Sequence, residues 1–219
     1  MLDLDIIKLV SQNYSSRRCV IPAVVVLHYS AGLDAEGTVR WLQQKEARAS
    51  YHFVISRSGK VWRLVAPSRA AWHCGKAEVP VANYMTSEAN RITLGFCLAN
   101  AGLLHREGDK WLIPRKTFDK SRWPVYPKRY AEPLEATLAF DSALIPKVTG
   151  YWEPYTEEQL KVLDILLKAQ GAHKLARVGH NELAMPLGRK LDPGPLLPDQ
   201  FLLPRPLLWK DHYRAYRLD

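Results

Sequence analysis

Residues 20–28, VIPAVVVLH, form an apolar run that ends in a histidine. Val24, Val25 and Val26 are β-branched, and a nearly continuous apolar run of this length is typical of a strand buried on both faces. The run is too short to span a bilayer. It therefore predicts a central strand, with His28 at the strand end, where the clefts of α/β folds form.

Further strands are predicted on the C-terminal side of this run. Residues 50–56 alternate in character as a strand does, residues 57–60 carry a turn signal, and residues 61–65 return as a second strand. Residues 91–98 predict another strand. We therefore expect an α/β fold with a central mixed sheet flanked by helices and a cleft at one end of the sheet.

Two helices are predicted from apolar spacing. Residues 36–47 form the first, in which Val39, Trp41 and Leu42 are expected to supply the buried stripe. Residues 156–170 form the second, which opens with a threonine and a glutamine three positions later, the pattern of a capping box. Its leucines then recur at helical spacing.

No repeat or linker divides the chain, so we expect a single domain over residues 1–219. Its core covers about residues 20–197. Residues 101–154 show no sustained period and are rich in Pro, Trp, Tyr, Lys and Arg, so we interpret them as an irregular insertion that walls a groove, with a short helix near residues 131–140. Residues 198–219 are expected to form a terminal helix or packing arm.

The charge balance favours a polyanionic partner. The chain has 31 basic and 22 acidic residues, for a net charge of +9. Nucleic acid, acidic lipid and an acidic cell-wall polymer would each suit that charge. The insertion interleaves bases with aromatics, as single-stranded nucleic-acid binders do, but no nucleic-acid-binding motif accompanies them. We therefore expect no nucleic-acid partner.

Cysteine usage and the N-terminus bear on the compartment. Three cysteines are an odd number and do not form a disulfide framework, which favours a reducing compartment. The N-terminus, MLDLDIIK, carries acids where a secretory signal would carry bases. We expect a monomer that is cytoplasmic as synthesised, without stable membrane insertion, and that reaches its site of action after release.

Residues 178–193, VGHNELAMPLGRKLDP, place three chemically active side chains on one loop. The imidazole of His180 and the carboxylate of Asp192 are ligand types that zinc takes. Lys190 supplies a positive charge of the kind that stabilises an oxyanion. A further ligand must come from elsewhere in the chain, and His28 is the best candidate.

With these segments in view, the chain resembles the type-2 zinc-dependent N-acetylmuramoyl-L-alanine amidases, a family that includes phage lysozyme-like amidases and the peptidoglycan recognition proteins. The likeness covers most of residues 22–197. It rests on VVVLHYSAG, SYHFVISRSGKVWRLV, AWHCGKA, ITLGFCLAN, YTEEQL and VGHNEL through GRKLDPGP. The insertion resembles that of a phage- or prophage-encoded subgroup, which implies an endolysin.

The resemblance implies a role for each matched residue. His28, His180 and Asp192 are expected to bind one zinc ion, with a water in the fourth position. The expected catalytic residues are Lys190 and Tyr51, and the expected substrate-binding residues are His73 and Trp72. Cys97 falls where other branches of the family carry a catalytic glutamate. In the absence of that glutamate, the resemblance implies a larger catalytic role for Tyr51.

The implied reaction is hydrolysis of the amide between N-acetylmuramic acid and L-alanine in peptidoglycan. Lys190, with the hydroxyl of Tyr51, would stabilise the oxyanion. The general base stays open among Tyr51, Glu182 and the activated water itself. Two alternatives also stay open: a non-catalytic peptidoglycan-binding module, although such modules lose a zinc ligand, and a cytosolic amidase that recycles muropeptides.

Overall fold

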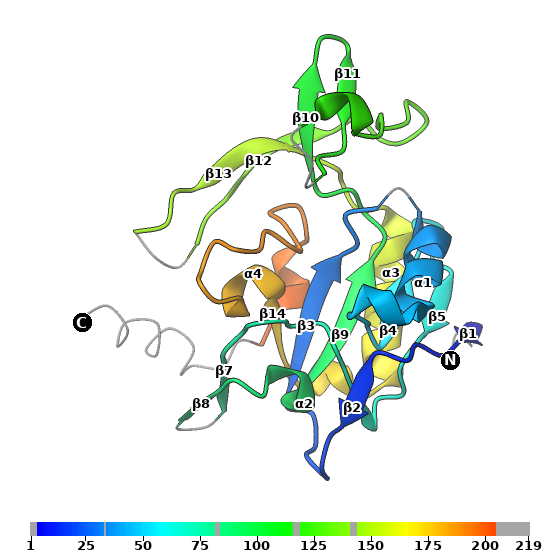
Figure 1. Ribbon diagram of the computed structural model, residues 1–219, viewed down its shortest axis with the longest axis vertical. Coiled ribbons are helices and arrows are strands. Elements are labelled where there is room, and N and C mark those ends of the chain that lie inside the picture. The colour runs from blue at the N-terminus through cyan, green and yellow to red at the C-terminus, as the bar shows by residue number, and fades with distance from the viewer. Residues whose placement is uncertain (1–3, 33, 82–83, 116–118, 141–143, 205–219) are drawn as a thin grey trace.

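A six-stranded mixed sheet runs through the centre of the molecule (Figure 1). The computed structural model describes residues 4–32, 34–81, 84–115, 119–140 and 144–204. In spatial order the strands of this sheet are β1 (Ile6–Lys8), β5 (Val61–Arg63), β4 (Phe53–Ile55), β9 (Thr93–Leu98), β3 (Val24–Tyr29) and β14 (Ala176–Gly179). Only the β4–β5 pair is antiparallel.

The central strand is the predicted one. Val24 to Leu27 are at most 2% exposed, and successive side chains point to opposite faces of the sheet. Val25 and Leu27 pack on one face and Val24 and Val26 on the other. By the same alternation His28 lies on the face of Val24 and Val26.

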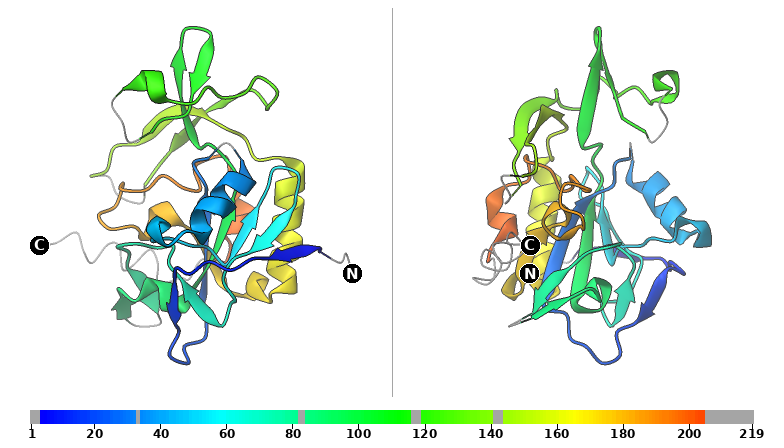
Figure 2. Two further views of the ribbon diagram at one scale, coloured as in Figure 1. Left: turned by 45° about the vertical axis from the view of Figure 1, so that its right-hand side comes forward. Right: turned by 60° about the vertical axis from the view of Figure 1, so that its left-hand side comes forward.

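Helices cover both faces of this sheet (Figures 1 and 2). On one face lies α3 (Glu157–Ala169), which begins at the predicted capping box of Thr156 and buries Leu163, Leu166 and Leu167 against Val25 and Leu27. The other helices are α1 (Ala35–Gln43), α2 (Ala89–Ile92) and α4 (His180–Leu183). The predicted α/β fold with a central mixed sheet is confirmed. No helix in the described ranges has the length and apolar character needed to cross a membrane.

Two local predictions need correction. Trp41 was expected in the buried stripe of its helix, but its side chain is 55% exposed while Val39 and Leu42 are buried. Residues two apart on a helix do not face the same side, so Trp41 and Val39 cannot share one buried stripe. The strand predicted from residue 91 begins at Thr93, because α2 ends at Ile92.

The remaining elements are short. Two small sheets pair β2 (Tyr14–Ser16) with β6 (Arg69–Ala71), and β7 (Val79–Val81) with β8 (Tyr84–Thr86). Single 3-10 turns are η1 (Lys45–Ala47), η2 (Lys120–Arg122), η3 (Ala172–Lys174) and η4 (Asp199–Leu202). Phe201 and Leu202 of η4 pack into the core, whereas residues 205–219 of the predicted C-terminal arm lie outside the described residues.

The segment interpreted as an irregular insertion contains a second sheet of four antiparallel strands, which stands above the central one (Figures 1 and 2). Its order is β11 (Lys110–Leu112), β10 (Leu103–Glu107), β13 (Val148–Trp152) and β12 (Leu134–Leu138). The helix predicted near residues 131–140 is wrong, because β12 pairs along its whole length with β13. That long-range pairing satisfies the backbone groups that a helix would have satisfied locally.

Candidate metal centre

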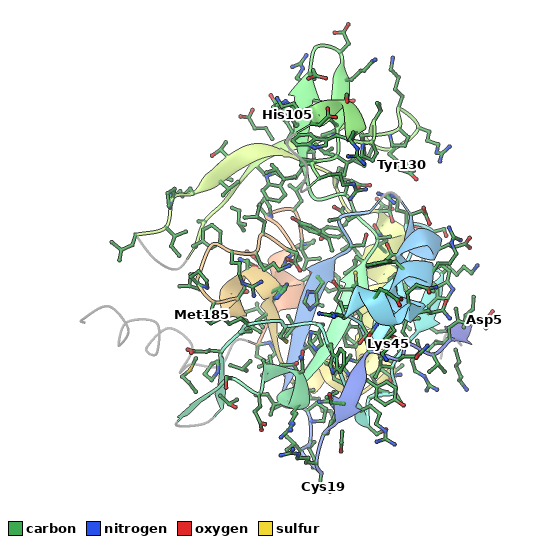
Figure 3. The ribbon with its side chains drawn as sticks, viewed as in Figure 1. Asp5, Cys19, Lys45, His105, Tyr130 and Met185 are labelled. Atoms are coloured by element: carbon green, nitrogen blue, oxygen red, sulfur yellow. The ribbon has the colours of Figure 1, made fainter. Side chains whose placement is uncertain are left out.

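Two histidines lie at the same end of adjacent parallel strands. His28 is the fifth residue of β3, and His180 follows β14 directly, as the first residue of α4. Gly179 pairs with Leu27, so the two histidines leave the β3–β14 pair side by side. In Figure 3, Met185 marks the loop that leads away from α4. Asp192 lies further along this loop, and its carbonyl accepts a hydrogen bond from the backbone N–H of Asn181 at 2.8 Å.

Three donor atoms converge at this point. Oδ2 of Asp192 lies 2.8 Å from Nδ1 of His28 and 3.0 Å from Nδ1 of His180. One ligand atom from each residue lies within 4.8 Å of the others. The three residues are 0%, 3% and 7% exposed for His28, His180 and Asp192. The structure therefore brings the three predicted ligands together.

The second ring nitrogen of His180 has a backbone partner. Nε2 lies 3.0 Å from the carbonyl oxygen of Cys74, which can only accept, so Nε2 carries a hydrogen. Nδ1 is therefore the nitrogen of His180 that could bind a metal, and it faces Oδ2 of Asp192 at 3.0 Å. Two imidazole nitrogens and a carboxylate oxygen directed at one point fit a divalent metal ion.

Burial acts on the charges of the other two ligands. Desolvation, followed by the charge of His180, lowers the pKa of His28 to about 4, so its imidazole is neutral at neutral pH. Burial alone would raise the pKa of Asp192, but the facing histidines His180 and His28 outweigh it and hold that pKa well below its ordinary value. Neutral imidazoles and an ionised carboxylate are the forms in which these side chains bind metal.

The predicted catalytic residues border this cluster. The ring of Tyr51 lies just before β4, with its centroid 4.9 Å from that of His28. Burial raises the pKa of Tyr51 well above its ordinary value. Lys190 is half-buried, and its charge contributes to the lowered pKa of His28. Cys97 pairs with His28 across β9 and β3, and burial raises the pKa of its thiol well above the usual range.

Trp72 and His73 lie apart from each other although they are adjacent in sequence. The Trp72 side chain is 36% exposed, and its indole N–H donates to Oγ of Ser15 at 2.7 Å. His73 is 6% exposed, and its Nδ1 lies 3.1 Å from Nε2 of His28. Substrate contact by Trp72 and by His73 stays a prediction, and His73 is a buried neighbour of the predicted ligand His28.

Sequence reasoning missed two polar residues that hold this region. Oδ1 of Asn90 accepts hydrogen bonds from the backbone N–H groups of His73 and Cys74, each at 3.0 Å. Oγ1 of Thr93 lies 3.0 Å from Nε2 of His73. Neither residue belongs to a recognisable motif, and their contacts span 16 to 20 positions. Nothing in the local sequence signals them.

Two imidazoles and one carboxylate, held on a rigid α/β frame, are typical of catalytic zinc sites with three protein ligands. The site is thus of a class that could hold one divalent metal ion with three protein ligands. The model of the N-acetylmuramoyl-L-alanine amidase family, Amidase_2, matches residues 18–195. The chain belongs to this amidase family, which confirms the resemblance seen in its motifs.

Solved structures share the fold. The N-acetylmuramyl-L-alanine amidase AmiD from E. coli, solved with anhydro-N-acetylmuramic acid-L-Ala-D-gamma-Glu-L-Lys, is 21% identical with a TM-score of 0.53, covering 88% of this chain and 58% of that one. This chain thus spans little more than half the length of AmiD. An AmpD structure is 17% identical with a TM-score of 0.50, covering 92% and 93% of the two chains. No curated protein sequence matches significantly.

Proposed function

We propose that this chain is a zinc-dependent amidase that hydrolyses the bond between the lactyl group of N-acetylmuramic acid and L-alanine. The observation that carries the proposal is the convergence of His28, His180 and Asp192 on one buried point, within a chain of the amidase family. All three donors are present, which speaks against a recognition module that has lost its metal.

The surrounding residues suit the chemistry of amide hydrolysis. A zinc ion held by the three donors supplies a Lewis acid for the scissile carbonyl and lowers the pKa of water toward neutrality. The ammonium group of Lys190, whose charge acts on His28, would stabilise the oxyanion of the tetrahedral intermediate. Tyr51 keeps its proton because burial raises its pKa, so its hydroxyl is suited to donate a hydrogen bond to the same oxyanion.

The candidates for the general base differ in their surroundings. Glu182 accepts a hydrogen bond from the backbone N–H of Gly179 at 2.8 Å through Oε1, which commits that oxygen to the start of α4. Tyr51 retains its proton and is a poor base in this environment. Both observations favour the activated water itself as the group that handles the proton, with Tyr51 as a donor.

We further propose that the enzyme acts on the polymeric cell wall, as a phage or prophage endolysin that reaches the wall after release. The net charge of +9 would draw the protein to an anionic wall polymer. The connection between β12 and β13 lies next to the loop that carries Lys190 and Asp192, where a Cβ on Gly188 would stand 3.0 Å from Ile145. The inserted segment enlarges the protein surface beside the site, which suits a long substrate. A muropeptide-recycling enzyme is the alternative.

The test is digestion of purified peptidoglycan with and without a chelator, with the products read by mass spectrometry. We expect release of stem peptides that begin with L-alanine, lost on chelation and restored by zinc. Asp192→Ala should lose both zinc and activity, whereas Asp199→Ala, an exposed carboxylate outside the site, should keep both. Sedimentation with the wall without cleavage would establish a recognition module, and activity on soluble muropeptides alone would establish recycling.

A further inference from the structure

His73 is a buried imidazole for which the proposed reaction has no use. Both of its ring nitrogens have partners: Nδ1 lies 3.1 Å from Nε2 of His28, and Nε2 lies 3.0 Å from Oγ1 of Thr93. Oγ1 of Thr93 in turn lies 2.7 Å from the carbonyl oxygen of Ala89. These contacts form one chain that runs from a metal ligand to the backbone of α2.

The direction of every hydrogen bond in this chain follows from its far end. The carbonyl of Ala89 can only accept, so the hydroxyl of Thr93 donates to it and has no second hydrogen to give. Nε2 of His73 must therefore donate to Oγ1 of Thr93. A neutral imidazole has a single N–H, so Nδ1 of His73 is bare and accepts.

The hydrogen-bond directions also determine the tautomer of His28. Because Nδ1 of His73 is bare, Nε2 of His28 must donate to it, which leaves Nδ1 of His28 bare and directed at Oδ2 of Asp192. The thiol of Cys74, 3.4 Å from the same Nδ1, is a rival donor. If the thiol donated instead, the nitrogens of His28 and His73 would oppose each other at 3.1 Å as two bare acceptors.

We propose that His73 is a positioning residue, which fixes His28 in the tautomer that offers Nδ1 to the metal, with the Thr93 hydroxyl setting the direction. The proposal rests on the metal site of the proposed function. It replaces the substrate contact expected of His73 from the resemblance. The side chain of His73 thereby does for His28 what the carbonyl of Cys74 does for His180. Each accepts a hydrogen bond from Nε2, so that Nδ1 is the nitrogen left for the metal.

Contacts with the central sheet and with Asn90 hold the ring of His73 in position. The ring lies over Gly95 of β9, where an added Cβ would stand 2.7 Å from Cγ of His73. The backbone N–H of His73 is held by Asn90 at 3.0 Å. A ring confined in this way retains its orientation before any metal binds, as positioning requires.

The first test reads tautomers in the zinc-loaded protein, by long-range proton–nitrogen NMR of the imidazoles. We expect His73 to carry its hydrogen on Nε2 and to accept at Nδ1 from Nε2 of His28. In Thr93→Val the hydroxyl no longer sets the direction of the hydrogen bonds, so a mixture of tautomers should appear at His73. A wild-type His73 that carries its hydrogen on Nδ1 would overturn the proposal.

The second test measures zinc affinity by competition with a chelator of known strength. His73→Phe removes the acceptor and should weaken zinc binding about 10- to 100-fold, the usual effect of losing such a partner. His73→Asn keeps an amide oxygen near the position of Nδ1 and should restore most of the affinity. His173→Phe, the same substitution at an exposed histidine of η3, at the opposite end of β14 from His180, is the matched control and should bind zinc as the wild type does.

The outcomes separate this proposal from the one on which it rests. Wild-type affinity in His73→Phe would overturn the positioning role even if the enzyme is an active zinc amidase. If the wild type binds no zinc at all, the metal-dependent function fails, and the positioning role that rests on it fails with it. Should His73→Phe not fold, Thr93→Val serves in the affinity measurement, with weaker binding expected.

Discussion

At Asp192, a single carboxylate oxygen faces two imidazole nitrogens in a buried space, and the second nitrogen of each imidazole faces a different kind of partner. The three ligands could be predicted because each lies in a short motif of recognisable residue types. The partners could not. The backbone carbonyl of Cys74 cannot be recognised as a partner from the sequence. His73, which follows β6, is positioned by the packing of its ring against Gly95 of β9 in the folded chain.

Lys190 offers the sharpest prediction at this scale. Lys190→Ala should keep the bound zinc but lower kcat by about two to three orders of magnitude, because it removes a charge that stabilises the oxyanion. Zinc content and kcat measured on the same preparation check this. Lys168→Ala, at an exposed ion pair with Asp164 on α3, is the control and should leave both unchanged. Wild-type turnover in Lys190→Ala would remove that residue from the mechanism.

At the scale of elements, the added sheet is joined to the central one by a buried ion pair. Arg57, in the turn between β4 and β5, donates to both carboxylate oxygens of Glu153, at 2.6 and 2.7 Å. Glu153 also accepts from the backbone N–H of Ala101, so one carboxylate ties both ends of the insertion to that turn. Residues 57 and 153 lie 96 positions apart, and no local pattern could have paired them.

Arg57→Ala should lower the free energy of unfolding by about 3–5 kcal/mol, because it leaves the buried carboxylate of Glu153 without its cation. Urea denaturation measures this change. Lys60→Ala removes an exposed ion pair with Glu36 and should cost less than about 1 kcal/mol. Equal effects of the two substitutions would show that the Arg57–Glu153 pair does not hold the insertion.

At the scale of the whole molecule, several histidines are buried in their neutral form close to the sheet. Burial lowers the pKa of His28 to about 4 and that of His52 to about 3, from an ordinary value of 6.5. His73 shifts in the same direction for the same first cause. Because these pKa values are lower in the folded chain, the unfolded chain binds more protons at any pH below 6.5.

The metal-free protein should therefore lose stability as the pH falls from 6.5 toward 4. The slope should be about 1.4 kcal/mol per pH unit for each histidine that stays neutral when folded. Asp192, whose folded pKa is depressed, adds a further loss once the pH falls through its ordinary value of 3.8. Urea denaturation in the presence of chelator, repeated across this range, measures the slope. A free energy of unfolding that stays constant between about pH 6.5 and 5 would contradict it.

The sequence alone determined the central strand that ends in His28, the capped helix α3, the mixed α/β architecture and the three candidate ligands. Each depends on interactions between residues close in sequence, or on a motif whose chemistry is carried by its own side chains. Tertiary structure decided the rest. It turned residues 134–138 into a strand, exposed Trp41 and placed His73 behind His28. These outcomes depend on partners that are distant in the chain, and the backbone and ring nitrogens of a residue take whichever partner the completed fold brings within hydrogen-bonding distance.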